Sequence, residues 1–270
     1  MKLLQAGCCY GQENIVLKGG RFKRIKFPAL VGVFQHPKHG VILFDTGYTK
    51  RFAEETNSLP NKLFAWMLPH EVAPHQTALA QVQNMGFSAS DVKYIIVSHF
   101  HADHVCGLSD FPEATIVCSK DAYANIRDID ERKALQQGVL TGLIPEDLEQ
   151  RVWLYDGDER VKSMAYRPFK KVHDLFGDGS IVLFPLPGHQ TGQIGALVQS
   201  EKEPMFLIAD ACWLSKAYKE MIMPSSLTKF LISDFKAYED TLDKLNQFYR
   251  LYPDIPMIPS HCLETINRFG

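Results

Sequence analysis

The chain has 270 residues, of which 46% are hydrophobic, and 29 Lys plus Arg stand against 31 Asp plus Glu. A chain of this length and composition buries a sizeable core, which excludes a disordered protein. The balanced charge lacks the basic footprint of a nucleic-acid binder, so we expect no nucleic-acid partner. No apolar run reaches the roughly 18 residues of a membrane span, so we expect none.

Residues 1–9 begin like a lipoprotein signal, but their apolar stretch is shorter than the roughly 7–15 residues of a signal core. We therefore predict a first β-strand there. The six cysteines form no C-x-x-C pair, and a chain of this size needs no disulfide scaffold. We expect six reduced, mostly buried thiols, which favours a cytoplasmic location.

Short apolar runs rich in Val, Ile and Phe and bounded by turn residues predict strands. They cover residues 29–34, 41–44, 94–97, 115–118, 152–155, 181–185, 194–198, 205–209 and 256–258. Apolar residues at helical spacing predict helices over 77–85 and over 234–251, the latter capped by Ser233 or Asp234. A weaker pattern predicts a third helix over 131–140. Strands and helices therefore alternate along the chain.

One apolar segment has two interpretations. Residues 58–75 carry Leu63, Phe64, Trp66, Met67 and Leu68 between prolines. The segment belongs either to the core or to an apolar flap over a site, and the sequence leaves both open.

The most informative stretch is residues 98–104, Ser-His-Phe-His-Ala-Asp-His. His99, His101, Asp103 and His104 are potential metal ligands within six residues, directly after a predicted strand. A loop at a strand end can aim such closely spaced side chains at one point, and imidazole with carboxylate suits Zn or another transition metal. We therefore predict a metal site. Isolated histidines carry no such signal, and we expect ordinary roles for His36, His39, His70, His75 and His173.

Three later residues have the same character. His189, Asp210 and His261 each lie just beyond a predicted apolar strand. Ligands at several strand ends can converge at one edge of a layered fold, so we expect them to join the site.

Together these motifs resemble the metallo-β-lactamase superfamily, and the resemblance extends from residues 42–47 to His261. Asp45-Thr46-Gly47 is similar to the family's first motif, and residues 99–104 match the second. The resemblance implies an α/β fold, a four-layer αββα sandwich with two mixed β-sheets, as a single domain over residues 1–270.

The resemblance also implies a ligand set for two divalent metal ions, with Zn as the default and Fe, Mn or Co compatible with mixed ligands. One metal would take His99, His101 and His189, and the other Asp103, His104 and His261. Asp210 would bridge the two metals. Asp45 would hold a ligand or a loop in place from outside.

Within the superfamily, the layout is most similar to that of the acyl-homoserine lactonases, as the stretch 187–193 indicates. His101 stands where the diiron oxygen reductases carry Glu, which disfavours that redox branch. The lactonases typically carry Tyr three residues after the bridging Asp. Here Trp213 stands there, and an indole donates a hydrogen bond but supplies no phenolic proton. Tyr218 is an alternative source of that proton.

The resemblance implies a hydrolase in which a metal-activated water attacks an ester or lactone carbonyl of a small molecule. Asp103 would carry the proton to the leaving group. Candidate residues of an apolar substrate pocket, which would otherwise be core residues, are Phe64, Trp66, Met67, Trp213, Phe230 and Tyr218. The alternatives are a thioesterase of a biosynthetic pathway and a metal-binding regulatory protein with little catalysis. A homodimer is left open.

Overall fold

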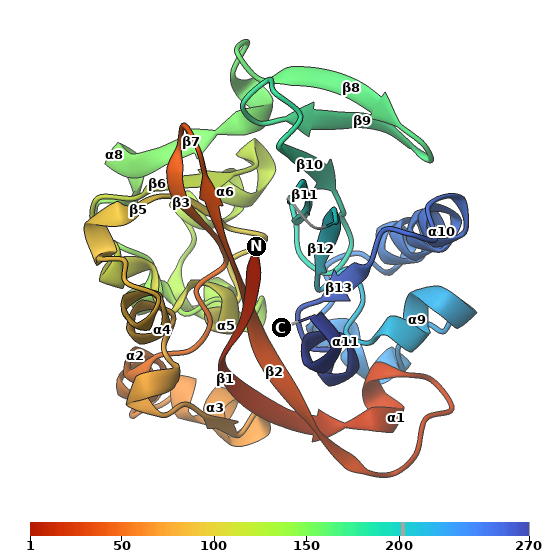
Figure 1. Cartoon of the computed structure of the whole chain (residues 1–270). Coiled ribbons are helices and arrows are strands. Elements are labelled where there is room, and N and C mark those ends of the chain that lie inside the picture. The colour runs from red at the N-terminus through yellow and green to blue at the C-terminus, as the bar shows by residue number, and fades with distance from the viewer. Residues whose placement is uncertain (201–202, 270) are drawn as a thin grey trace.

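The computed structural model describes residues 1–200 and 203–269. Two β-sheets pack face to face, and helices cover both outer faces (Figure 1). The predicted four-layer αββα sandwich is therefore confirmed.

The first sheet has seven strands in the order β4-β1-β2-β3-β5-β6-β7. Their bounds are β1 Lys2–Gln12, β2 Arg24–His36, β3 Gly40–Phe44, β4 His70–Glu71, β5 Val92–Ile96, β6 Thr115–Cys118 and β7 Val152–Leu154. Strands β4, β1, β2 and β3 pair antiparallel, whereas β3, β5, β6 and β7 pair parallel.

The second sheet has six strands in the order β13-β12-β11-β10-β9-β8. Their bounds are β8 Lys162–Tyr166, β9 Phe169–Asp174, β10 Ile181–Pro185, β11 Ile194–Val198, β12 Met205–Ala209 and β13 Met257–Pro259. Strands β12 and β13 are parallel, and the other pairs are antiparallel. Both sheets are thus mixed, as predicted.

Three apolar layers hold the sandwich together. Between the sheets, Phe34 and Phe44 of the first sheet pack in one cluster with Leu183 and Leu207 of the second. The outer face of the first sheet is covered by α2 Lys50–Glu55, α4 Ala78–Asn84, α5 Ala102–Val105, α6 Lys120–Arg127, α7 Glu131–Gln136 and α8 Leu148–Arg151. The outer face of the second is covered by α9 Ser215–Glu220 and α10 Phe235–Leu251.

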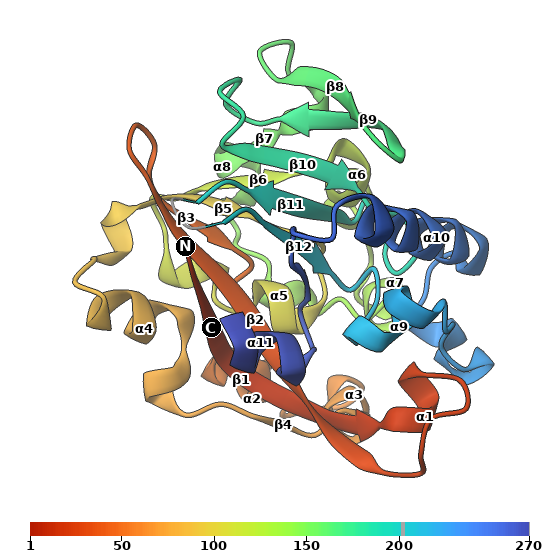
Figure 2. The same ribbon diagram turned by 45° about the vertical axis from the view of Figure 1, so that its right-hand side comes forward.

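Three helices lie at the edges of the sandwich, namely α1 Glu13–Val16, α3 Asn61–Met67 and α11 Leu263–Phe269. In the view turned by 45°, α1 lies at one end of the long β1–β2 hairpin, and α11 lies along the hairpin beside α9 (Figure 2). No helix within 1–200 or 203–269 is long and apolar enough to cross a membrane.

The two strongest helix predictions are confirmed, and their caps explain where they begin. Thr77 accepts a hydrogen bond from the Ala80 amide at the start of α4, and Asp234 accepts from the amides of Lys236 and Ala237 at the start of α10. The predicted helix over 131–140 is too long, because α7 ends at Gln136. Gly138 follows with φ +72°, a left-handed conformation that ends a helix.

The apolar runs predicted most of the described strands, but β4, β8 and β9 were missed, and β4 has only two residues. The hairpin of β8 and β9 escaped because β8 is largely exposed and polar, with little alternation to recognise. The predicted N-terminal strand is present as β1. All six cysteines are free and buried.

Within the segment 58–75, helix α3 forms an exposed flap, whereas β4 joins the first sheet beside β1. Helix α3 buries no residue fully, and Trp66 of α3 is 81% exposed. Phe64 alone of its aromatic residues packs partly against the core.

Candidate metal centre

The candidate ligands come from five strand ends that meet at one edge of the sandwich. Asp45 follows β3, and the loop carrying His99 and His101 follows β5 in the same sheet. His189, Asp210 and His261 follow β10, β12 and β13 in the second sheet. The site therefore joins the two sheets, and all the predicted ligands are buried except the half-buried Asp103.

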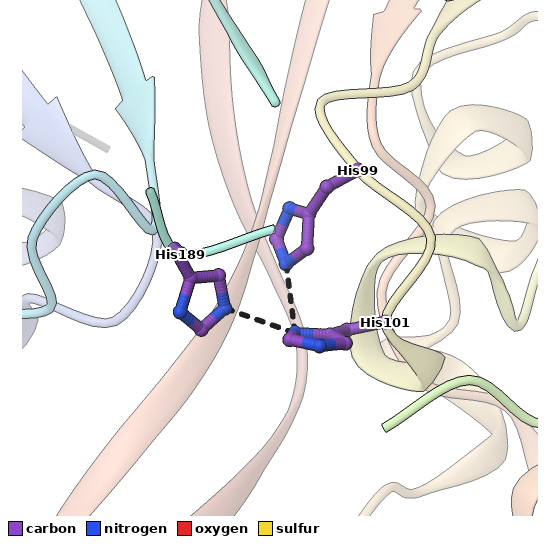
Figure 3. A group of neighbouring side chains, drawn as sticks. All are labelled: His99, His101 and His189. Carbon is purple, nitrogen blue, oxygen red and sulfur yellow. Dashed lines mark hydrogen bonds between the residues drawn. The ribbon is translucent and has the colours of Figure 1, made fainter. Parts of the chain in front are cut away.

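One group of three histidines faces a common point (Figure 3). His101 Nδ1 lies 3.1 Å from His99 Nε2 and 2.9 Å from His189 Nε2. Three ring nitrogens from two sheets are thus close enough to bind one metal ion.

A second group lies beside the first. The Oδ2 atom of Asp103 is 3.3 Å from His261 Nε2 and 3.8 Å from His104 Nε2. These three residues also bring one ligand atom each within 4.8 Å of one another.

The carboxylate of Asp210 lies between the two groups. Its Oδ2 atom is 3.4 Å from His189 Nε2 and 3.1 Å from His261 Nε2, and its Oδ1 atom is 3.5 Å from His104 Nε2. Asp210 can therefore contact an ion in either group.

Buried Asp45 orients two of the histidines from outside. Its Oδ2 atom accepts from His104 Nδ1 at 2.7 Å and from the Ser98 hydroxyl at 2.7 Å. Since that hydroxyl donates to Asp45, it accepts from His99 Nδ1 at 2.9 Å. Both rings therefore carry their proton on Nδ1 and turn a free Nε2 lone pair inward.

Two further histidines are oriented by backbone carbonyls. His261 Nδ1 donates to Pro28 O at 2.7 Å, and His101 Nε2 donates to Gln137 O at 2.8 Å. Their inward nitrogens therefore also present lone pairs. Outward donation to an oxygen acceptor is the arrangement expected for metal-ligating histidine.

The inward atoms fit a cation. The lone pairs of His99 Nε2 and His101 Nδ1 face each other at 3.1 Å, which is repulsive unless a cation lies between them. His104 Nε2 and Asp210 Oδ1 are buried and have no hydrogen-bond partner within the described residues. A bound metal would satisfy these atoms, so the donor set fits the metals that the family uses.

Charge is distributed unevenly across the site. Burial, together with neighbouring histidines, lowers the pKa of His99 and of His189 well below the usual value, so both rings are neutral. Burial also lowers the pKa of His104, but Asp103, Asp45 and Asp210 outweigh it and raise that pKa to about 10. A metal ion that binds His104 Nε2 must therefore displace a proton from it, which leaves the Nδ1 proton donated to Asp45. The carboxylates thus attract positive charge to the second group.

Backbone conformation helps to aim Asp45. This residue has φ +59°, a left-handed conformation that is uncommon for a residue other than glycine. Gly47 follows with φ +66°, and a Cβ there would lie 2.3 Å from Ala6 Cβ. The turn after β3 therefore requires its glycine to pack against β1.

Another group of potential ligands lies at the far end of β2, formed by His36, His39 and Asp178. His36 Nδ1 accepts from the amides of Lys38 and His39, so Nε2 carries the proton, which it can donate to Ser180 Oγ at 3.0 Å. A ring with both nitrogens so engaged offers no lone pair, and the ordinary role expected for His36 stands.

A pocket of about 430 Å³ opens over the metal centre. Four predicted pocket residues line it, namely Phe64, Trp66, Met67 and Trp213, together with Phe27 and Leu231. Trp213 is buried and its indole N–H donates to Asp210 Oδ2 at 2.8 Å. Trp213 thereby contacts the carboxylate between the two groups.

The prediction that Tyr218 lines the substrate pocket is wrong. Tyr218 does not line the pocket, because α9 turns its ring into the outer core and its hydroxyl donates to Met257 O at 3.4 Å. The side chain of Phe230 lies outside the described residues.

Sequence reasoning missed several residues of the site. Ser98 adjoins the histidine motif, so its place next to a ligand could have suggested a supporting role. Tyr10, Arg24 and Phe27 line the pocket from the β1–β2 hairpin, far from any motif, and no sequence signal marks them.

Comparison with known proteins agrees with this geometry. The family model of the metallo-beta-lactamase superfamily matches residues 25–211. The chain therefore belongs to the metallo-beta-lactamase superfamily. This confirms the predicted family, and relatives with metal-dependent hydrolase activity confirm the predicted class of enzyme.

Two relatives are similar to this chain over most of its length. The chain is 25% identical over 230 residues to a probable metallo-hydrolase of Mycobacterium tuberculosis, covering 82% of this chain and 71% of that protein. It is 25% identical over 223 residues to the N-acyl homoserine lactonase AttM of Azorhizobium caulinodans, covering 80% and 76%.

A solved structure shows the same fold. An N-acyl homoserine lactone hydrolase with the product N-hexanoyl-L-homoserine at its catalytic metal center superposes with a TM-score of 0.75. The match covers 99% of this chain and 94% of that one at 17% identity.

Replacing Gly138 tests how closely the chain confines His101. A Cβ at Gly138 would lie 2.9 Å from His101 Nε2, so Gly138→Ala should displace that ring and weaken metal binding at least about tenfold. The dissociation constant is measured by competition with a chelator.

Gly86→Ala is the matched control, because Gly86 also has a left-handed φ of +89° but nothing within 4 Å of its Cβ position. It carries the same backbone strain without the contact. Equal metal affinity in both variants would contradict the confinement of His101.

Proposed function

We propose that this protein is a dinuclear metal-dependent hydrolase that cleaves an ester or lactone of a small molecule with an apolar part. The observation that carries the proposal is the pair of adjacent ligand groups joined by Asp210 beneath an apolar pocket. In two-metal sites the ions activate water and polarise the oxygen of a carbonyl.

His99, His101 and His189 would hold one ion, and Asp103, His104 and His261 the other, with Asp210 between them. Asp45 would keep the two rings it contacts in their ligating orientation. These assignments follow the facing lone pairs and the outward hydrogen bonds of the histidines.

Asp103 is suited to moving a proton. Its side chain is 16% exposed, more than the 4% of Asp210, and it lines the pocket. A carboxylate open to the substrate can accept a proton from water and pass it to the leaving group.

Tyr10 and Trp213, which also line the pocket, are poorly suited to donate a proton to the leaving group. Among the described residues that line the pocket, Tyr10 is the one phenol, and its hydroxyl donates to Glu71 Oε2 at 2.9 Å. This hydrogen bond raises the pKa of Tyr10 to about 12. Trp213 has no acidic proton, so the leaving group depends on Asp103.

The pocket walls favour an apolar group on the substrate. The lining of the pocket includes the apolar side chains of Ile15 and Val16 of α1, Phe64 and Met67 of α3, and Leu231. Apolar walls with a few polar groups at the base are typical of small-molecule sites. An acyl chain fits this arrangement.

The experiment that tests the proposal is hydrolysis of an acyl-homoserine lactone series, and of matched esters and thioesters, by the metal-loaded protein. We expect turnover that increases with acyl length and falls at least about 100-fold in Asp103→Asn, the order of general acid–base effects. Absence of turnover on every member, with metal bound and the fold intact by circular dichroism, would overturn the hydrolase proposal.

The bond from Trp213 to Asp210 gives a second prediction. Trp213→Phe removes one hydrogen bond to a charged group, worth about 1.5–3 kcal/mol, and should lower turnover roughly tenfold or more and weaken metal binding. Turnover and chelator competition are measured together.

Trp153→Phe is its control, because Trp153 donates an equally short bond of 2.8 Å to Asp158 outside the site. Turnover should persist in that variant. A Trp213→Phe enzyme with unchanged metal affinity and turnover would show that the indole does not position Asp210.

A further inference from the structure

A second cavity adjoins the metal pocket at the end of the β1–β2 hairpin. It has a volume of about 440 Å³ and is lined by the start of β2, α9 and α11 and by residues of α1. Figures 1 and 2 both show α1, α9 and α11 near one another there. We call it the basic cavity.

The two cavities share their walls. Arg24 lines both. After β12, Trp213 lines the metal pocket and the next residue, Leu214, lines the basic cavity. After β13, His261 lines the metal pocket and the next residue, Cys262, lines the basic cavity. The two cavities are therefore neighbours across a thin wall, and Arg24 stands where they meet.

The basic cavity carries an excess of positive charge. Its lining includes four cationic side chains, Lys23, Arg24, Lys26 and Lys216, against two carboxylates. Lys216 lies 3.8 Å from Glu220. Within the described residues no carboxylate lies within 4.0 Å of the charged nitrogens of Lys23, Arg24 or Lys26. Three cations therefore remain for a ligand.

The two carboxylates of the lining are engaged elsewhere. Glu13 Oε2 lies 3.0 Å from Arg21 Nε. Glu264 Oε2 accepts from the Ser215 hydroxyl at 3.1 Å, and its Oε1 lies 3.8 Å from Lys219 Nζ. The positive charges of Lys23, Arg24 and Lys26 are therefore not compensated by these two carboxylates.

Arg24 is held in place without using its hydrogen bonds. Its guanidinium lies 4.8 Å from the centre of the Tyr10 ring, and Tyr10 is in turn fixed by Glu71. Lys26 lies two residues along β2, so both side chains leave the same face of the strand. A stacked guanidinium keeps its fork of donors for a carboxylate or phosphate.

We propose that the basic cavity binds an anionic group, a phosphate or a carboxylate, carried by the leaving group of the substrate. This inference rests on the proposed hydrolase function and narrows its substrate class. The apolar acyl part lies in the metal pocket, and the leaving group passes Arg24. The substrate is then an acyl ester with a negatively charged leaving group, or the corresponding thioester, which the sequence left open as an alternative.

Paired thioesters test the proposal. Octanoyl-pantetheine and its phosphate differ by one phosphate, and the octanoyl thioesters of 2-mercaptoethanol and 3-mercaptopropionate supply the carboxylate pair. We expect the wild-type protein to have a KM about tenfold lower for the anionic member of at least one pair, equivalent to about 1.4 kcal/mol. The pair with the larger ratio identifies the anion.

Arg24→Ala should abolish that KM ratio, Arg24→Lys should restore part of it, and 0.5 M NaCl should reduce it by screening. Lys38→Ala is the matched control, an exposed lysine beyond the opposite end of β2, roughly 40 Å along the strand direction. The ratio should survive in that variant. Equal KM values in the wild type, or an unchanged ratio in Arg24→Ala, would overturn the anion site.

A binding measurement separates this proposal from the hydrolase function. Octyl phosphate and octanoate are titrated calorimetrically into the metal-loaded wild type, Arg24→Ala and Lys38→Ala. We expect about tenfold weaker binding of the preferred anion to Arg24→Ala only. If that difference holds while no ester or thioester is hydrolysed, the hydrolase function fails and the anion site stands. Equal binding to all three proteins rejects the anion site.

Discussion

The carboxylate of Asp45 is the constraint on which the metal centre depends. It is fully buried between the end of β3 and the histidine loop, and it accepts from the Ser98 amide, the Ser98 hydroxyl and His104 Nδ1. Through Ser98 it also sets the proton of His99. A buried carboxylate is costly unless its lone pairs are satisfied, so this network fixes loop and rings together. The free Nε2 atoms that face the metal position follow from that network.

The rest of the fold brings the second sheet to this loop. The amide of Ile194 at the start of β11 donates to Ser98 O at 2.9 Å, and the amide of Phe100 donates to Gln190 Oε1 at 2.7 Å. His189 therefore arrives next to His101 because the two sheets are hydrogen-bonded at their edge as well as packed through the core. The β1–β2 hairpin and helix α3 complete the wall of the metal pocket, and they contribute mainly apolar side chains to its lining.

Much of this could be predicted from the sequence, for identifiable reasons. The strands that carry ligands are continuous apolar runs because they are buried on both faces, and polar residues just beyond them are conspicuous. The position of the site could therefore be predicted from His99, Asp210 and His261. The residues between the two cavities could not be predicted, because Arg24 and Tyr10 lie on the β1–β2 hairpin, far in sequence from every motif. The pocket position predicted for Tyr218 is wrong, because the sequence after Asp210 does not reveal that α9 turns this ring into the core.

The proposed chemistry requires two metal ions that share Asp210. The most direct measurement is a crystal structure of the metal-loaded protein with anomalous data at the absorption edge of the bound metal. We expect two anomalous peaks roughly 3.5–4 Å apart. One should lie among His99, His101 and His189, the other among Asp103, His104 and His261, with one Asp210 oxygen near each or between them. A single peak at full metal loading, or peaks that leave Asp103 and His261 without metal, would rule out the dinuclear site.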